Sequence, residues 1–91
     1  MNALTNFKWS ALHIASKNNK YDAVKMLLDA GIDPNFQDED KNTALHLAVE
    51  LGHKDVIRLL VHYEKTNLEL RNNQGLLAKD LCTNGDIMKI F

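Results

Sequence analysis

The sequence predicts an all-α fold, a solenoid of stacked helix–turn–helix units joined by β-turn or hairpin-like loops. Two nearly identical stretches, SALHIA at 10–15 and TALHLA at 43–48, recur 33 residues apart in a chain of 91 residues. Apolar residues follow both stretches at helical spacing, and polar loops separate the helical segments. A fixed period of about 20–50 residues is the signature of repeat architectures, so this spacing decides the fold class.

The first helix of each unit is expected between a hydroxyl residue and a residue that tolerates a left-handed backbone. Ser10 and Thr43 precede the apolar positions and are predicted N-caps, because their side-chain oxygens can accept hydrogen bonds from unpaired backbone N–H groups. Asn19 and Gly52 fall where a C-cap is needed. The apolar face between these caps carries Leu12 and Ala15 in the first unit, and Leu45 and Ala48 in the second.

The second helix of each unit is expected at 21–30 and 54–63. Both segments carry apolar residues at helical spacing, which predicts one buried stripe on each helix. Lys25 and Arg58 fall on the polar side. The predicted stripes are Val24, Leu27 and Leu28 in the first unit, and Ile57, Leu60 and Val61 in the second.

The loops at 31–42 and 65–76 are rich in turn-forming residues and are predicted to form tight β-turn extensions. Residues 35–45 align with 69–79 at an offset of 34, which indicates a degraded third copy. After it, residues 78–91 run through a shortened helix pair that ends in the apolar stretch 86–91. The chain is therefore interpreted as one domain, 1–91, with units at about 5–37, 38–71 and 72–91.

Composition excludes several classes of function. A formal net charge of −1 and scattered lysines provide no basic surface for nucleic acid. No apolar stretch approaches the roughly 20 residues of a membrane span, and the N-terminus lacks the apolar region of a signal peptide. The single cysteine, Cys82, excludes an intramolecular disulfide and indicates a reducing compartment. A cytoplasmic or nuclear location is therefore expected.

The repeat resembles the ankyrin repeat, a 33-residue unit of a turn and two antiparallel helices. DEDKNTALHLAVELGHKDVIRLLV, from Asp38 to Val61, matches its pattern closely, and residues 8–35 match less well. The family's turn glycine is present only as Gly75, with Lys8 and Lys41 in the other copies. The third copy, with Lys79 and Asp80, resembles the capping repeats of the family. Alanine replaces the helix-opening proline in all three copies, at 11, 44 and 78.

Histidine is often a metal ligand or a general base, so the four histidines are candidates for chemistry. The resemblance implies that His13 and His46 support a neighbouring hydroxyl and the loop backbone. Stacked helices also lie about 10 Å apart, too far for equivalent side chains to share a metal ion. His53 and His62 are expected to be structural or exposed, and Cys82 to be a small buried hydrophobe at a helix position. The chain is therefore predicted to have no catalytic residue, metal or cofactor.

The resemblance implies a non-catalytic module that binds a protein partner through its concave face and turn tips. Phe7, Trp9, Leu51 and Leu76 are apolar at positions that need not be apolar, and Trp9 and Leu51 would act as anchors. Alternatively, Phe7 and Trp9 fold back over the open N-terminal flank. Two other roles stay open: a structural segment of a longer ankyrin-repeat protein, and self-association as a homodimer through uncapped ends. The candidate contact residues are Phe7, Trp9, Lys17, Asn18, Glu39, Asp40, Asn42, Glu50, Leu51, Asn73, Gln74 and Leu76.

Overall fold

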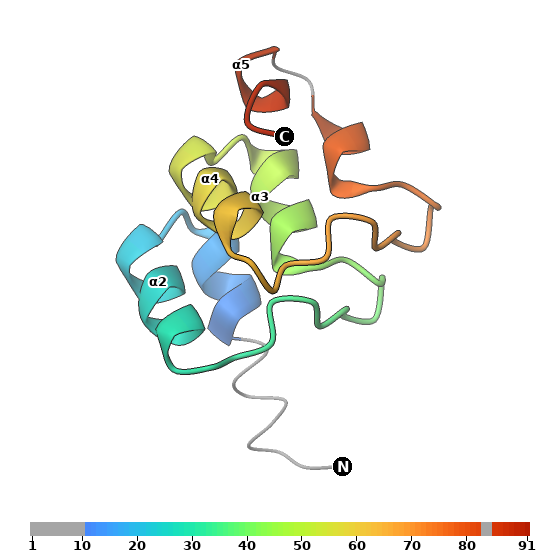
Figure 1. Ribbon diagram of the computed structural model, residues 1–91. Helices are drawn as coiled ribbons and strands as arrows, with labels where there is room; N and C mark the ends of the chain where they lie inside the picture. Colours follow the sequence, from blue (N-terminus) through green and yellow to red (C-terminus); the bar gives the residue numbers. More distant parts are fainter. Residues whose placement is uncertain (1–10, 83–84) are drawn as a thin grey trace.

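The structure, a computed structural model, describes residues 11–82 and 85–91. These residues form three helix pairs, named here units 1, 2 and 3, which stack one above the other (Figure 1). Unit 1 consists of the helical segment 11–17 and α2 (Tyr21–Asp29), and unit 2 of α3 (Ala44–Leu51) and α4 (Lys54–His62). Unit 3 consists of the 3₁₀ helix η1 (Ala78–Leu81) and α5 (Gly85–Met88). The predicted all-α class is confirmed.

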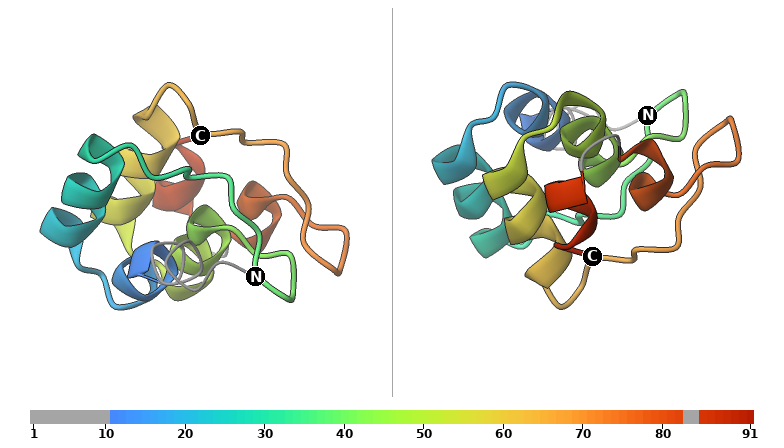
Figure 2. Two further views of the ribbon diagram at one scale, coloured as in Figure 1. Left: turned by 90° about the horizontal axis from the view of Figure 1, so that it is seen from below. Right: turned by 90° about the horizontal axis from the view of Figure 1, so that it is seen from above.

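The helices form two layers, and the loops extend to one side of them. Figure 2 shows α2 and α4 side by side, with the helical segment 11–17 and α3 lying between them and the loops. The loops that follow α2 and α4 project in the same direction, away from these helices. The only β-type pairing within residues 11–82 and 85–91 is one antiparallel bridge between Arg71 and Leu77.

The helix ends follow from the residues that the sequence places there. The Thr43 side chain accepts a hydrogen bond from the His46 N–H, which confirms Thr43 as the N-cap of α3. Gly52 ends α3 with a left-handed φ of 73°, and Asn19 ends the first helical segment with a φ of 59°. Both predicted C-caps are therefore confirmed. The predicted N-cap Ser10 lies outside the described residues.

The hydrophobic core lies between the stacked helix pairs and contains most of the predicted apolar positions. Leu27 and Val61 are half-buried against this core, while Lys25 and Arg58 are exposed as expected. Val56, which was not among the predicted stripe residues, is also fully buried. The buried residues include Leu12, Ala15, Val24, Leu28, Leu45, Ala48, Ile57 and Leu60.

Unit 3 departs from the expectation for Cys82 and for the last helix. Its first helix is only a four-residue 3₁₀ turn, and Cys82 follows it with extended backbone (φ −66°, ψ 125°). Cys82 is therefore half-buried beside the core, whereas a buried helix position was expected. The exposed Lys79 stands where α3 has the buried Leu45. A first helix of full length in unit 3 would therefore bury less apolar surface than α3 does. The last helix likewise ends at Met88 and does not continue to residue 91.

Among the residues that the structure describes, no helix combines the length and the hydropathy needed to cross a membrane.

Candidate functional site

The loop before α3 forms a tight turn, named here finger 1 (residues 38–42). The Asp38 side-chain oxygen Oδ1 accepts hydrogen bonds from the N–H groups of Asp40 and Asn42, each at 2.9 Å. The backbone N–H of Asp38 donates to the Asn42 carbonyl at 3.0 Å, which closes the turn. Lys41 supplies the left-handed residue of this turn, with a φ of 60°. One carboxylate therefore organises the whole finger.

The loop before η1 repeats this construction and is named finger 2 (residues 72–76). Asn72 Oδ1 accepts from the N–H of Gln74 at 2.9 Å and of Leu76 at 3.1 Å. The Asn72 N–H donates to the Leu76 carbonyl at 3.0 Å, and Gly75 supplies the left-handed residue (φ 75°). Each bond has its counterpart 34 residues earlier in finger 1, so the alignment of the third copy is correct here.

Direct hydrogen bonds hold the two fingers together. The Asn73 N–H donates to the Asp40 carbonyl at 2.9 Å, and Asn72 Nδ2 donates to Asn42 Oδ1 at 3.2 Å. At the base of the fingers, Gln37 Nε2 donates to the Arg71 carbonyl at 2.8 Å. These bonds fix one tip relative to the next, so the fingers form one continuous surface.

Two histidines attach the fingers to the helices. His13 Nε2 lies 2.9 Å from the Asn42 carbonyl oxygen, and His46 Nε2 lies 2.9 Å from the Leu76 carbonyl oxygen. Because a carbonyl can only accept, each Nε2 is the donor. His46 Nδ1 accepts from the Thr43 N–H at 3.3 Å and lies 2.8 Å from Thr43 Oγ1. Both ring nitrogens of the buried His46 are therefore occupied by scaffold contacts.

The other two histidines differ in exposure. His53 is half-buried, and its Nε2 donates to the Lys17 carbonyl at 2.7 Å, which ties the start of α4 to unit 1. His62 is exposed in the last turn of α4. These positions agree with the expectation that His53 is structural or exposed and that His62 is exposed.

Metal and thiol chemistry find little support in the described part of the chain. Within residues 11–82 and 85–91, no group of three or more His, Cys, Asp or Glu side chains could hold a metal ion. Burial raises the pKa of the Cys82 thiol, and the negative charge of Asp80 raises it further. A thiol with a raised pKa is a weak nucleophile at neutral pH, because little thiolate is present.

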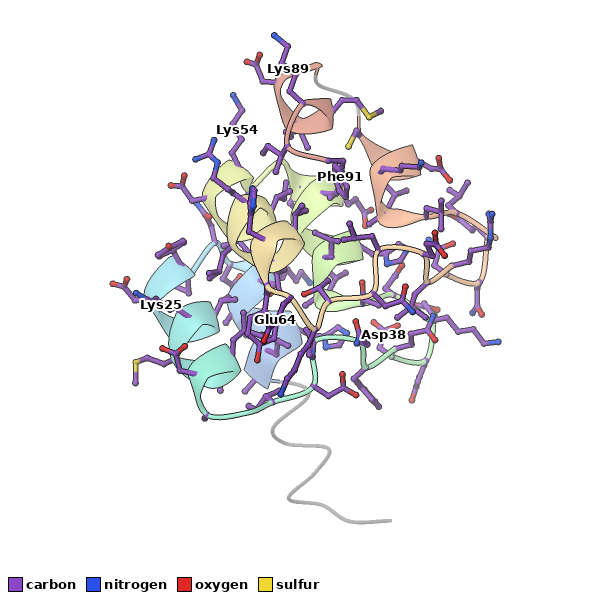
Figure 3. All side chains as sticks on the ribbon, in the orientation of Figure 1. Lys25, Asp38, Lys54, Glu64, Lys89 and Phe91 are labelled. Carbon is purple, nitrogen blue, oxygen red and sulfur yellow. The ribbon has the colours of Figure 1, made fainter. Side chains whose placement is uncertain are left out.

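A groove of about 330 Å³ lies between the fingers and the ends of α3 and η1. Its walls come from both fingers, from Glu50 in α3 and from Leu81 in η1. In Figure 3, Asp38 marks the finger side of the molecule, and Lys25 of α2 lies on the opposite side. The groove is lined by Asp40, Asn42, Glu50, Asn72, Asn73, Gln74 and Leu81.

The groove has an acidic character. Asp40 and Glu50 line it, and no lysine or arginine does. Within the described residues the ion pairs join Lys54 to Asp86 and Arg58 to Asp55, so neither groove carboxylate is neutralised by an ion pair. The two carboxylates offer only acceptors to a ligand, whereas the side-chain amides of the groove carry both donors and acceptors.

The structure brings together five of the predicted contact residues in the groove wall. Glu39 is exposed beside the groove in finger 1, and Leu51, 49% exposed, follows Glu50 at the end of α3. Leu76 is half-buried, and its carbonyl is held by His46. The five groove residues are Asp40, Asn42, Glu50, Asn73 and Gln74. Lys17 and Asn18 are exposed at the end of the first helical segment, and Phe7 and Trp9 lie outside the described residues.

Two groove residues, Asn72 and Leu81, were not among the predicted contacts. Asn72 aligns with Asp38 at the offset of 34, which identifies it as a turn residue but not as part of the groove wall. Leu81 aligns with the half-buried Leu47 of α3, so a core position was the simpler expectation. Leu81 is instead the last residue of the short helix η1, where its half-buried side chain lines the groove.

Comparisons with known proteins agree with this architecture. The family model for ankyrin repeats (3 copies) matches residues 1–88. The human neurogenic locus notch homolog protein 2 is 37% identical over 85 residues, and the Drosophila melanogaster neurogenic locus Notch protein is 39% identical over 80 residues. These matches cover 89% and 84% of this chain, respectively, but the chain spans only 3% of either relative.

A solved structure shows the same fold. The crystal structure of the ankyrin repeat domain of Bcl-3 superposes with a TM-score of 0.82 at 26% sequence identity. The match covers 87% of this chain and 34% of the Bcl-3 chain. Ankyrin repeats are in general protein–protein interaction modules. The repeated helix pairs, the paired fingers and the family match together establish that this chain belongs to the ankyrin-repeat family.

Proposed function

We propose that this chain is a non-catalytic module that binds a protein partner in the groove between its fingers and the ends of α3 and η1. The observation that carries the proposal is the shared groove wall. Side chains from finger 1 and α3, and from finger 2 and η1 some 30 residues later in the sequence, line one concave surface. A rigid surface assembled from several elements suits recognition, because little of it must be ordered when the partner binds.

The groove chemistry favours a partner segment that carries lysine or arginine. The carboxylates of Asp40 on finger 1 and Glu50 on α3 both line the groove and are not neutralised by an ion pair within the described residues, so they would attract a cationic side chain. Glu39, exposed on the same finger, would add to the negative field and speed the encounter with a basic partner. Leu51 would then cover the apolar part of that side chain at the edge of the groove.

The occupied histidines support a role without catalysis. A general base needs a ring nitrogen within reach of a substrate, whereas both nitrogens of His46 contact the scaffold. Cys82, with its raised pKa, is poorly suited to nucleophilic attack. The single cysteine fits a reducing location, and we place the module in the cytoplasm or the nucleus.

The test compares two charge-reversal variants of the whole chain. The groove variant carries Asp40→Lys and Glu50→Lys, and the matched control carries Asp22→Lys and Asp55→Lys on α2 and α4. All four residues are exposed acids, so both variants change the net charge equally. Each immobilised protein is used to capture partners from cell extract, and equal melting temperatures (Tm) verify that both variants are folded.

We expect the parent chain and the control to capture the same set of proteins. The groove variant should capture at least about tenfold less of these proteins, because a close pair of opposite charges becomes repulsive. Equal loss in both variants would point to non-specific charge effects. Loss in the control alone would place the binding surface on α2 and α4. Either result contradicts the proposal.

A further inference from the structure

The first helices of units 1 and 2 carry opposite charges at equivalent positions. Lys17 stands 33 residues before Glu50, and each residue lies in the last turn of its helix. Both side chains are exposed. Within the part of the chain that the structure describes, neither side chain belongs to an ion pair. The surface that these two helices share therefore changes sign from one unit to the next.

Lys17 lies on the groove side of unit 1, just outside the groove wall. Equivalent residues of stacked units point in the same direction, and Glu50 lines the groove. The backbone at Lys17 is also fixed relative to unit 2, because its carbonyl accepts a hydrogen bond from His53 Nε2 at 2.7 Å. Packed helices lie about 8–10 Å apart, so the positive charge stands about one helix spacing beyond Glu50.

We infer that the partner segment carries two opposite charges about 10 Å apart, with a basic side chain in the groove and an acidic side chain over Lys17. This inference rests on the proposed function, in which Asp40 and Glu50 attract the basic side chain. A uniformly basic segment would also fit the groove, but it would bring a like charge toward Lys17, which weakens binding. The charge pair would therefore select among basic partners and fix which end of the segment crosses unit 1.

An extended segment matches this spacing with a short sequence pattern. A polyproline II segment rises about 3.1 Å per residue and completes a turn in three residues, so residues i and i+3 project from the same side about 9 Å apart. In an α-helix, which rises about 1.5 Å per residue, the same spacing needs residues i and i+7. A groove of about 330 Å³ is too small to receive a helix about 10–12 Å wide. We therefore expect a basic and an acidic residue separated by two others.

Peptides selected from a random library test this pattern. A phage-displayed library of random dodecapeptides is panned against the full chain, against Lys17→Glu and against the control Lys25→Glu. Lys25 is an exposed lysine of α2 on the side of the molecule opposite the fingers, and both variants change the net charge equally (Figure 3). Equal Tm values verify that both variants are folded.

The full chain and the control should enrich peptides that pair a basic residue with an acidic residue three positions away. Lys17→Glu should enrich a second basic residue at that position instead. For one selected peptide, synthesised with blocked ends, Lys17→Glu should weaken binding about threefold to tenfold, because an exposed attraction becomes a repulsion. Replacing the acidic residue of the peptide with lysine should restore binding to Lys17→Glu, which a variant with a damaged fold could not do.

The results that would overturn the inference differ in what they mean for the proposed function. Lys17→Glu could leave the selected pattern and the affinity unchanged, or could weaken binding no more than Lys25→Glu does. If the groove variant, Asp40→Lys with Glu50→Lys, still loses binding, the groove then binds basic segments without recognising a second charge. If the selected peptides lack basic residues, or bind the groove variant as tightly as the parent chain, the proposed function is contradicted together with the inference.

Discussion

The helical layers and the fingers of this protein are stabilised in different ways. The helices are held by burial of repeated apolar side chains, such as Leu12 and Leu45, which occupy equivalent places in units 1 and 2. The fingers bury little apolar surface. They are held by side chains that bind backbone groups, with Asp38 in finger 1 and Asn72 in finger 2 each accepting two N–H groups. The backbone of each finger therefore depends on a few side-chain atoms, those of Asp38 in finger 1 and of Asn72 in finger 2.

Within each finger, the residues that hold the backbone are therefore different from the tip residues that are candidates for partner binding. Equivalent tip positions carry different residues, Glu39 against Asn73 and Asp40 against Gln74, although the backbone of the two fingers is the same. Residues that repeat in kind, including His13 and His46, hold the fingers to the helices. Of the tip residues that do not repeat, Asp40, Asn73 and Gln74 line the groove. The following predictions test this division.

The largest expected effect is in the helical core. Leu45→Ala should lower the free energy of unfolding by about 2–5 kcal/mol, because it leaves a cavity at a fully buried site in the central helix. Urea denaturation measures the change, with Leu51→Ala as the control at the exposed end of the same helix. The control should change stability by less than about 0.5 kcal/mol. Equal effects would mean that α3 packs through another face.

The contact between helix and finger should be next in size. His46→Ala removes the donor to the Leu76 carbonyl and the acceptor for the Thr43 N–H, so it should cost about 1–3 kcal/mol. His53→Ala, which loses one bond at a more exposed site, should cost less than about 1 kcal/mol. Both are measured by urea denaturation. A loss of stability at His53 equal to that at His46 would contradict the buried scaffold role of His46.

A smaller effect distinguishes the two fingers. Lys41 and Gly75 occupy the same left-handed position, where only glycine avoids a steric penalty. Lys41→Gly should therefore raise the free energy of unfolding by up to about 1 kcal/mol, and Gly75→Lys should lower it by about 1–2 kcal/mol. Paired urea titrations of the two variants measure both changes. If Lys41→Gly were destabilising, the lysine side chain would have a structural role.

The weakest effect concerns Cys82 and should leave the fold unchanged. Because burial and Asp80 raise the pKa of this thiol, the folded protein has less thiolate at pH 8 than free cysteine. Iodoacetamide should label Cys82 more slowly than free cysteine at pH 8, and the difference should shrink as pH rises through the raised pKa. Asp80→Asn should increase the labelling rate, since it removes one of the two causes. An unchanged rate would remove Asp80 as a cause.

Much of the scaffold could be predicted because local physical chemistry determines it. Thr43 as N-cap and Asn19 and Gly52 as C-caps follow from residue type, and the equivalence of the fingers follows from the offset of 34. The resemblance to the ankyrin repeat also implies that His46 supports a hydroxyl and the loop backbone, although not that it binds the Leu76 carbonyl.

The parts that could not be predicted depend on packing between units. The first helix of unit 3 is a four-residue 3₁₀ turn, in which the exposed Lys79 and Asp80 stand where α3 has the buried Leu45 and His46. Because this helix ends at Leu81, Cys82 lies outside it, and Leu81 lines the groove. The bond from Asn72 to Asn42 likewise joins two loops that are separated by an entire unit. Contacts of this kind, between residues far apart in the sequence, cannot be predicted from a local sequence pattern.

Hydrogen–deuterium exchange of the full chain, with and without a captured partner, shows whether partners bind between the fingers and the helix ends. Binding there should slow exchange in residues 38–43, 50–52 and 72–77 and leave exchange in α2 unchanged. Slower exchange confined to α2 and α4, on the opposite side of the molecule, would contradict it.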